Sequence, residues 1–396
     1  MEGLKITKRD YVRLLDGKVA EALREYRWRR VFSQYECLMK EDDHGPKSAS
    51  PRIIPYLDGR RSIVCYGNDK NGSYNHHNQL VKFRGSYYFA WSNGIRNEED
   101  GGQRVLMASS PNGIHWSEPW VVLSPQAGES LAHNCVGLYV QDDALFAVIM
   151  TEDTVHDETV TGMRRIKPDS HVVRIYRSIN TTDWDAVFTF GDRVKWLFEA
   201  PRLTKEGRLL CVCNTVKEGP AVLLWPGADI TRMPDFIFVP EPEGASFPYG
   251  ESTWYQLDSG RIMVFWRDEG ASCQLYVNWS DDGGRTFSVP VLSDIPDSMS
   301  RVYAGRLSDG RYYLCGNAIA NLLDRSPLML LLSDSGTVFN KVYMVNDGVS
   351  VMRLKGMLKV NGNQYPCCLT DGSTLLIAYD QNKEDPVVDV IDTTLI

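Results

Sequence analysis

The sequence predicts an all-β protein built as a β-propeller, and three observations support this class. A hairpin template recurs along the chain: a β-branched and aromatic run, a turn of the Asp-Gly type, and a second such run. Copies after Tyr74 recur roughly every 50 to 67 residues, which suits four-stranded antiparallel blades. A third element, a short turn rich in Ser, Asp and Gly, follows several of the hairpins. Radial repetition leaves only short, protected sheet edges, so many strands coexist without aggregating.

Seven hairpins fit the template, and they predict seven blades. They span residues 51–66, 75–91, 132–150, 198–214, 250–267, 300–317 and 363–380. The first two lie close together, so six blades with a closing strand is the alternative.

The turn Ser280–Phe287, SDDGGRTF, contains the residue types that stabilise a tight turn. Ser280 and Asp282 are able to accept hydrogen bonds from backbone N–H groups, and the two glycines supply positive φ. Phe287 is then expected to fold back as an apolar plug. Degenerate copies of this turn begin at Ser110, Ser178 and Ser333.

The N-terminal region predicts a helix over Thr7–Arg30, with Thr7 and Asp10 as a capping pair and an apolar stripe at helical spacing. We expect this helix to pack on the outside of the propeller. The expected division is an N-terminal helical extension over 1–45 and a catalytic propeller domain over 46–396.

Composition excludes several classes of function. A net charge of −8 argues against a nucleic-acid partner, which usually needs a basic face. The sequence contains no run of about 18 apolar residues, so it predicts no membrane span, and its first residues, MEGLKITKRD, show no secretory signal. The nine cysteines are an odd number without a CxxC pair, which favours reduced, buried thiols and a cytoplasmic location.

Polar residues gather where the first strand of each hairpin begins, the end that opens on the central channel of a propeller. They fall within a window of seven to ten residues before the turns of their hairpins. The set comprises Arg52, His76, His77, His133, Glu199, Glu251, Arg301 and Tyr365. The sequence therefore predicts that they converge on one pocket, whereas the alternative is ordinary exposed strand starts.

The residue types in this set indicate the chemistry. Its carboxylates, imidazoles and phenol supply acids and bases. Fixed cations come from Arg52 and Arg301 and, further along the same hairpins as Glu199 and Glu251, from Arg202 and Arg267. Arginine binds a planar carboxylate bidentately, so the pocket is expected to take an anionic ligand such as a sugar acid. For any single arginine, a structural salt bridge is the alternative.

The sequence predicts neither a metal nor a cofactor. His76 and His77 are adjacent, so a regular strand would direct them to opposite sides, which makes them poor co-ligands. No GxGxxG, Walker-type loop or GxSxG elbow occurs.

At Ser280–Phe287 the chain resembles the sialidase-like superfamily, whose propellers carry Asp-box turns of the form SxDxGxTW. The resemblance covers roughly residues 50–390. It implies that Glu251, the following Asp-Ser-Gly turn and Arg267 correspond to a sialidase block of glutamate, turn and arginine. Tyr365 then looks like the nucleophilic tyrosine, assisted by a carboxylate. An exo-sialidase is one function that this resemblance implies.

The blade over 75–91 looks more like bacterial propeller enzymes that act at rhamnose–glucuronate linkages, including the ulvan-lyase-type families. Asn75-His76-His77, Trp91-Ser92-Asn93 and Gly102-Gln103-Arg104-Val105 carry this resemblance. It implies a polysaccharide lyase acting by β-elimination, or a rhamnosidase-type hydrolase, on an acidic oligosaccharide. In the lyase, an arginine neutralises the uronate carboxylate, one group removes the C5 proton and another protonates the leaving oxygen.

The leading expectation is therefore cleavage of a rhamnose–glucuronate linkage, with exo-sialidase activity and non-catalytic glycan binding as alternatives. Expected catalytic residues are His77, His133, Tyr365 and Glu251. Expected substrate-binding residues are Asn75, His76, Asn134, Glu199, Arg202, Arg267, Arg301 and Arg52.

Overall fold

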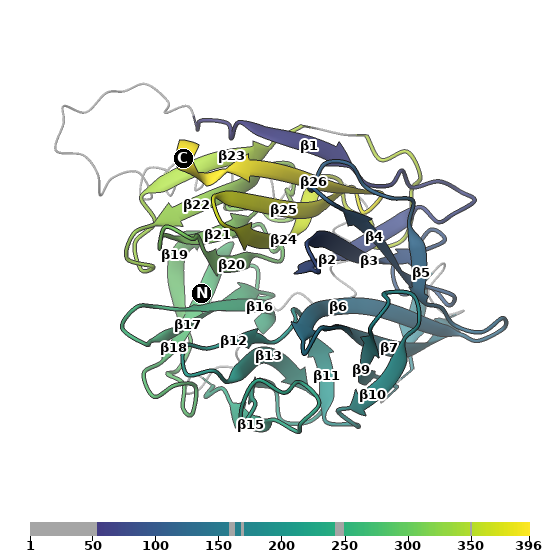
Figure 1. Cartoon of the computed structure of the whole chain (residues 1–396), viewed down its shortest axis with the longest axis horizontal. Coiled ribbons are helices and arrows are strands. Elements are labelled where there is room, and N and C mark those ends of the chain that lie inside the picture. The colour runs from purple at the N-terminus through teal and green to yellow at the C-terminus, as the bar shows by residue number, and fades with distance from the viewer. Residues whose placement is uncertain (1–53, 158–162, 168–169, 242–248, 349–350) are drawn as a thin grey trace.

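Six antiparallel sheets surround a common axis in the computed structural model, which describes residues 54–157, 163–167, 170–241, 249–348 and 351–396 (Figure 1). We number these sheets as blades 1 to 6 in the order of their first strands. Blade 1 contains β2 (Tyr74–Phe83), β3 (Ser86–Gly94), β4 (Arg104–Ser110) and β5 (Trp120–Leu123). Blade 2 contains β6 (Leu131–Gln141), β7 (Ala144–Asp157), β9 (Val172–Ser178) and β10 (Asp185–Thr189), with β8 (Met163–Ile166) paired to β7. Blade 3 contains β11 (Val194–Leu197) and β12 (Arg202–Leu203), both paired to β13 (Leu209–Thr215), then β14 (Pro220–Leu224) and β15 (Asp235–Phe238).

The remaining three blades follow the same order. Blade 4 contains β16 (Tyr249–Gln256), β17 (Ile262–Asp268), β18 (Gln274–Ser280) and β19 (Val291–Pro296). Blade 5 contains β20 (Tyr303–Arg306), β21 (Tyr312–Gly316), β22 (Leu328–Ser333) and β23 (Lys341–Asn346). Blade 6 contains β24 (Asn363–Asp371), β25 (Thr374–Gln381), β26 (Asp385–Asp392) and β1 (Gly59–Ile63). The first strands of neighbouring blades contact one another, as β2 contacts both β6 and β24.

The prediction of seven blades is wrong, because the first hairpin is not a blade. Among the described residues of this segment, 54–66, the one strand is β1, and it pairs with β26 from Gly59↔Ile391 to Ile63↔Val387. Figure 1 shows β1 beside β26, so the start of the described chain closes the sheet at its end. The other six predicted hairpins each supply the inner part of one blade. Six blades with a closing strand, the alternative reading, is what the structure has.

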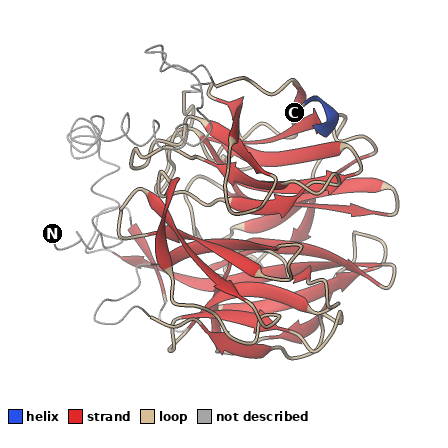
Figure 2. Ribbon diagram, turned by 90° about the vertical axis from the view of Figure 1, so that its left-hand side faces the viewer, coloured by secondary structure: helices blue, strands red, loops and turns tan. Residues whose placement is uncertain are grey.

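The expected N-terminal helix, and with it the extension over 1–45, lies outside the described residues. Within the described ranges, the one helical element is the short 3₁₀ turn η1 (Thr393–Leu395), and Figure 2 shows strands throughout the rest of the fold. None of the described helical structure has the length and hydropathy of a membrane span.

The core is divided into apolar layers between neighbouring blades. Between blades 3 and 4, for example, Leu210 and Leu224 pack with Trp254 and Trp266. Phe287 joins this layer and is 7% exposed, as expected for the plug of the Asp-box turn. Burial of such apolar area is the main stabilising contribution to the fold.

The Asp-box turn forms as its sequence predicts. The backbone N–H of Gly284 donates to Ser280 Oγ (2.9 Å), and that of Thr286 donates to Asp282 Oδ1 (2.9 Å). Gly283 and Gly284 have φ of 71° and 86°, the left-handed region that glycine adopts without strain. The related turns at Ser110, Ser178 and Ser333 likewise join the third strand of a blade to its fourth.

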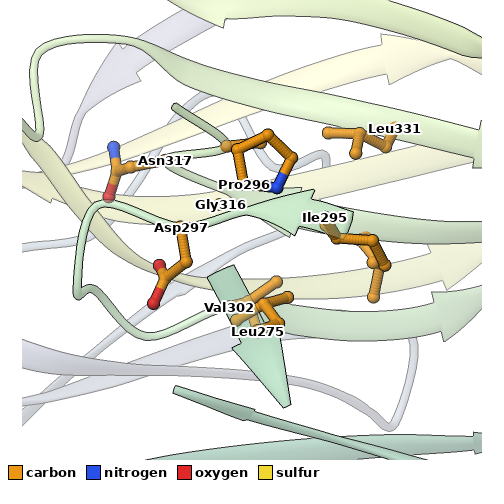
Figure 3. Close-up of a pocket in the computed structure, with 10 residues that line it drawn as sticks. Leu275, Ile295, Pro296, Asp297, Val302, Gly316, Asn317 and Leu331 are labelled. Carbon is orange, nitrogen blue, oxygen red and sulfur yellow. The ribbon is translucent and has the colours of Figure 1, made fainter. Parts of the chain in front are cut away.

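A small cavity of about 10 Å³ lies between blades 4 and 5, lined mainly by apolar residues such as Leu275, Ile295 and Leu331 (Figure 3). Asp297 and Asn317 also line it. Asp297 Oδ1 accepts the N–H of Ser300 (3.2 Å), whereas Oδ2 has no hydrogen-bond partner among the described residues. Burial raises the pKa of Asp297 to about 7.

This buried carboxyl predicts a stability change with pH. The folded-state pKa of Asp297 is raised, so its contribution to stability is full below about pH 4 and is lost as the pH rises towards 7. Asp297→Asn keeps an oxygen for the Ser300 N–H and removes the titration. We expect the variant to gain up to about 4 kcal/mol of unfolding free energy relative to wild type between pH 4 and pH 8.

Denaturant unfolding at the two pH values measures this difference. Asp192→Asn, at an exposed position, is the control and should show no such gain. A stability difference between Asp297→Asn and wild type that is the same at both pH values would contradict the assignment of a buried, protonated carboxyl.

Candidate active site

Three bulges of the same kind interrupt the first strands of blades 1, 4 and 6, and each presents a polar side chain. His77 and Asn78 lie opposite one residue of β3, because the register shifts between His76 and Gln79. The register of β16 shifts around Glu251, and that of β24 around Tyr365. A bulge inserts an extra residue and re-aims side chains, so the three strands direct these groups differently from a regular ladder. His77 and Tyr365 have φ of 59° and 55° there.

The phenol of Tyr365 meets the carboxylate of Glu251 at this point. Tyr365 Oη donates to Glu251 Oε1, and Arg267 Nη1 donates both to Glu251 Oε2 and to Tyr365 Oη, the latter over 3.1 Å. Arg267 stands opposite Glu251 at the end of β17, and Tyr365 is 5% exposed. These contacts join blade 4 to blade 6 across the axis.

Glu251 and Tyr365 are held in different protonation states. Burial alone would raise the pKa of Glu251, but the Arg267 guanidinium and the hydrogen bonds from Tyr365 and Arg267 lower it to about 2. Burial and the Glu251 charge hold the pKa of Tyr365 well above its ordinary value, although Arg267 and Arg325 act in the opposite direction. The free protein therefore holds an ionised carboxylate that accepts a hydrogen bond from a neutral phenol.

The two adjacent histidines lie on the same side of the strand, next to Tyr365. Their ring centroids are 4.7 Å apart, and the ring of His76 lies 3.9 Å from that of Tyr365. The expectation that adjacent histidines point apart is wrong here, because it assumed a regular strand and His77 occupies a bulge. His76 Nδ1 lies 2.7 Å from Asp380 Oδ2, and His77 Nδ1 lies 3.1 Å from Ser92 Oγ.

His77 is the more accessible imidazole. Its side chain is 18% exposed, and its Nε2 lies 4.0 Å from Glu98 Oε1. Burial lowers the pKa of His77 to about 4, assisted by Lys383 and Arg301, while Glu98 raises it. Burial also lowers the pKa of His76 well below its ordinary value. At neutral pH the imidazole of His77 is therefore neutral.

Three further basic side chains surround these rings. Arg325 lies 5.5 Å and Lys383 5.6 Å from the centroid of the Tyr365 ring. Arg301 is 2% exposed, and its Nε and Nη2 atoms have no hydrogen-bond partner among the described residues. Its charge acts on His76, His77 and Glu199, which places it near the axis. A buried guanidinium is normally paired, so these two donors are where an anionic ligand is expected.

His76, His77 and Glu98 also offer a set of possible metal ligands, whose donor atoms lie within 4.8 Å of one another. The surrounding charge argues against a divalent cation. Lys383 Nζ already donates to Glu98 Oε2 (2.7 Å), and the positive charges of Lys383, Arg325 and Arg301 all act on His76. The same charges favour an anionic ligand.

His133 lies on β6 of blade 2. Its Nδ1 lies 2.9 Å from Thr151 Oγ1 on β7. Burial lowers its pKa to about 4. Ser92 Oγ, which lies 3.1 Å from His77 Nδ1, also accepts the N–H of Cys135, two residues after His133. The role of His133 in catalysis stays a prediction.

Two other predicted binding residues have side-chain oxygens engaged by the protein, although Asn134 Nδ2 has no hydrogen-bond partner among the described residues. Asn75 Oδ1 accepts from Trp91 Nε1 and Asn93 Nδ2, each over 2.8 Å, and Asn134 Oδ1 accepts from Gln103 Nε2 (2.7 Å). Their role in binding substrate stays a prediction.

The buried Glu199 and the partly buried Arg202 form an ion pair of 2.9 Å within blade 3, and Glu199 Oε2 also accepts from Thr253 Oγ1 of blade 4 (3.1 Å). Arg202 Nη1 also donates to the carbonyl of Ala304 (2.8 Å).

Arg52 lies outside the described residues. Glu98, Arg325, Asp380 and Lys383 were not predicted from the sequence. Most predicted residues lie at the starts of first strands, whereas Asp380 lies near the end of the second strand of blade 6, where it pairs with Gln364.

The fold and these contacts define a sialidase-like propeller with a polar axial site. The chain belongs to the BNR repeat-like domain family, whose model matches residues 85–377. No curated protein sequence matches the chain.

Solved structures share the fold at low identity. A protein of unknown function from Dyadobacter fermentans has a TM-score of 0.65 and 16% identity, and the match covers 86% of this chain and 100% of that one. The NanB sialidase from Streptococcus pneumoniae has a TM-score of 0.61, 11% identity and coverage of 87% and 72%. Trypanosoma rangeli sialidase in complex with the inhibitor DANA has a TM-score of 0.61, 10% identity and coverage of 86% and 60%, so this chain spans about three fifths of that sialidase. At these identities the likeness shows the fold alone.

Proposed function

We propose that this protein is a glycoside hydrolase that cleaves the glycosidic bond of a sugar bearing a carboxylate, with Tyr365 as the nucleophile. The sialidase-like BNR propeller fold suggests a carbohydrate-related activity. The observation that carries the proposal is the contact between the Tyr365 phenol, the ionised Glu251 carboxylate and Arg267. A tyrosine paired with a carboxylate is an arrangement that glycosidases use for acidic sugars.

The proposed reaction has two steps. Tyr365 Oη attacks the anomeric carbon and passes its proton to Glu251, while the bond to the leaving oxygen breaks and that oxygen takes a proton from His77. Water then attacks the same carbon and gives a proton to His77. The bond to Tyr365 breaks, and the phenolate recovers its proton from Glu251. Arg301 holds the sugar carboxylate through its unpaired Nε and Nη2 donors.

Trapping the covalent intermediate tests this route directly. The protein is incubated with a fluorogenic sialoside to measure turnover, and with 2,3-difluorosialic acid to accumulate the adduct. Peptide mass spectrometry should then place the added mass on Tyr365. Turnover without any adduct on Tyr365 would contradict a tyrosine nucleophile.

A second candidate is β-elimination at a rhamnose–glucuronate linkage, and the neutral state of His77 favours it. A neutral imidazole is able to remove the C5 proton of the uronate, with Tyr365 protonating the leaving oxygen. Incubation with rhamnosyl-glucuronate oligosaccharides distinguishes the chemistries, because elimination yields an unsaturated uronate that absorbs in the ultraviolet and hydrolysis yields free rhamnose. Glycan binding without cleavage of either substrate would indicate a non-catalytic sugar-binding propeller.

The pH dependence of kcat/KM separates the two roles of His77. If His77 acts as the acid of hydrolysis, its protonated form is required in the free enzyme, and kcat/KM should fall about tenfold for each pH unit above about 4. If His77 acts as the base of elimination, kcat/KM rises to a plateau above about pH 4. For hydrolysis we expect the first profile, and His77→Gln should remove this limb. A plateau of kcat/KM extending to neutral pH would instead indicate that His77 is the base of elimination.

A further inference from the structure

Tyr365 lies in a bulge, outside the regular pairing of β24 with β25. The register between β24 and β25 breaks from Gln364 to Cys367, and Tyr365 has φ of 55° in that gap. Such a conformation persists only when surrounding groups fix it. The contacts with Glu251 and Arg267 engage the phenol oxygen, so other groups must hold the ring and the backbone.

Two fully buried side chains contact the ring and backbone of Tyr365, and a third bonds to both of them. Asn78 Nδ2 donates to the backbone carbonyl of Tyr365 (3.1 Å) and to Asp380 Oδ2 (2.9 Å). The same oxygen of Asp380 lies 2.7 Å from His76 Nδ1, and Asp380 Oδ1 accepts the N–H of Lys383 (2.9 Å). The ring of His76 in turn lies 3.9 Å from the ring of Tyr365. His76, Asn78 and Asp380 are all 0% exposed.

We propose that His76, Asn78 and Asp380 form a positioning unit that holds the ring of Tyr365 so that its phenol meets Glu251. The unit connects blade 1 to blade 6, because His76 and Asn78 lie on β2 and Asp380 lies on β25. Its inferred purpose rests on the proposed function, since it assumes that Tyr365 is the reacting group. The hydrogen bonds of Asp380 to His76 and Asn78 restrict the movement of the two side chains that contact Tyr365, which is what a nucleophile on a bulge requires. His76 Nε2 and Asn78 Oδ1 have no hydrogen-bond partner among the described residues.

Two observations favour positioning over a general structural role. Burial raises the pKa of Asp380 to about 8, so placing this carboxyl in the interior opposes folding at neutral pH. In addition, His76 contacts the ring of Tyr365 and Asn78 contacts its backbone carbonyl, and Asp380 bonds to both of these side chains. None of the three side chains is exposed to a ligand, so they act through Tyr365 and are not themselves catalytic.

The test uses the variants His76→Phe and Asp380→Ala in the full-length protein, with Asp380→Asn as a milder substitution that keeps one acceptor oxygen. His76→Phe keeps a ring beside Tyr365 and removes the bond to Asp380. Asp389→Ala is the matched control, because Asp389 is another buried carboxylate of blade 6, 2.9 Å from Arg61 and 3.0 Å from the Tyr379 hydroxyl. Circular dichroism and thermal unfolding establish which variants are folded.

The first measurement does not require a substrate. Tyrosine labelled with ¹³C at Cζ gives one resonance per tyrosine, and loss of a signal in Tyr365→Phe assigns Tyr365. We expect this resonance to shift or broaden in His76→Phe, Asp380→Ala and Asp380→Asn, and to stay in place in Asp389→Ala. An unmoved Tyr365 resonance in the folded variants of the unit would overturn the proposal, as would an equal change in the control.

The second measurement is the split between kcat and KM on the substrate that the wild type cleaves. Displacing a reacting group by about 1 Å costs on the order of 100-fold in rate, so kcat should fall about 10- to 100-fold. KM should stay within about threefold, because the unit does not contact substrate, and Asp389→Ala should keep wild-type kcat. Wild-type kcat in His76→Phe and Asp380→Ala would overturn the proposal. If wild type cleaves neither substrate, the proposed function fails and the Tyr365 resonance alone decides whether the unit positions the ring.

Discussion

Tyr365→Phe is expected to lower kcat at least about 1,000-fold while leaving the fold and KM nearly unchanged. The substitution removes one oxygen, which is the atom that bonds to the anomeric carbon in the proposed reaction. It keeps the ring that packs on His76, so the strained backbone at Tyr365 retains its support. Steady-state kinetics on the fluorogenic sialoside, together with thermal unfolding, measures both effects.

Tyr379→Phe is the matched control for this experiment. Tyr379 is also a fully buried tyrosine of blade 6, and its hydroxyl bonds Asn346 and Asp389 rather than Glu251. Its loss should cost stability and leave kcat within about threefold. If Tyr365→Phe keeps more than about a tenth of wild-type kcat, Tyr365 is not the nucleophile, whichever substrate is used.

The fold could be predicted from the sequence to the level of the blade because its signals are local. Alternating apolar residues and Gly-containing turns define each hairpin, and six of the seven predicted hairpins are the inner strands of six blades. The number of blades could not be predicted in the same way. The segment 51–66 has the composition of a hairpin, but β1 pairs with β26, more than 300 residues further along the chain. Only that long-range pairing shows that β1 closes a sheet instead of opening one.

The candidate site was predicted in part, for the same reason. His76, His77, Glu251, Arg301 and Tyr365 fall at equivalent positions before their turns, and the structure places them near one another. Spacing along a strand does not reveal a bulge, so the sequence indicated separate directions for His76 and His77. Asp380 and Arg267 lie at the ends of second strands, where the register with the first strand decides what each side chain meets. That register depends on the bulges, which only the folded chain shows.

Arg301→Met is expected to lower kcat/KM on a substrate bearing a carboxylate by about 100-fold or more and, at the same time, to raise thermal stability. Nε and Nη2 of Arg301 are buried without a hydrogen-bond partner among the described residues. In the free protein this buried charge costs solvation energy, which its attraction to Glu199 offsets only in part, whereas methionine fills a similar volume without charge. A bound carboxylate would supply two charge-assisted hydrogen bonds, each contributing about 1.5–3 kcal/mol.

The opposite signs of these two effects distinguish a binding arginine from a structural one. Arg202→Met is the comparison, because Arg202 is already paired with Glu199 at 2.9 Å and bonded to the carbonyl of Ala304. Its removal takes the ion-pair partner at 2.9 Å from the buried Glu199, so stability should fall. Arg301→Lys should recover little of the lost activity, since an ammonium does not reproduce the two parallel donors of a guanidinium. If Arg301→Met instead lowers stability and leaves kcat/KM unchanged, Arg301 supports the fold, and the carboxylate of the substrate must be bound elsewhere.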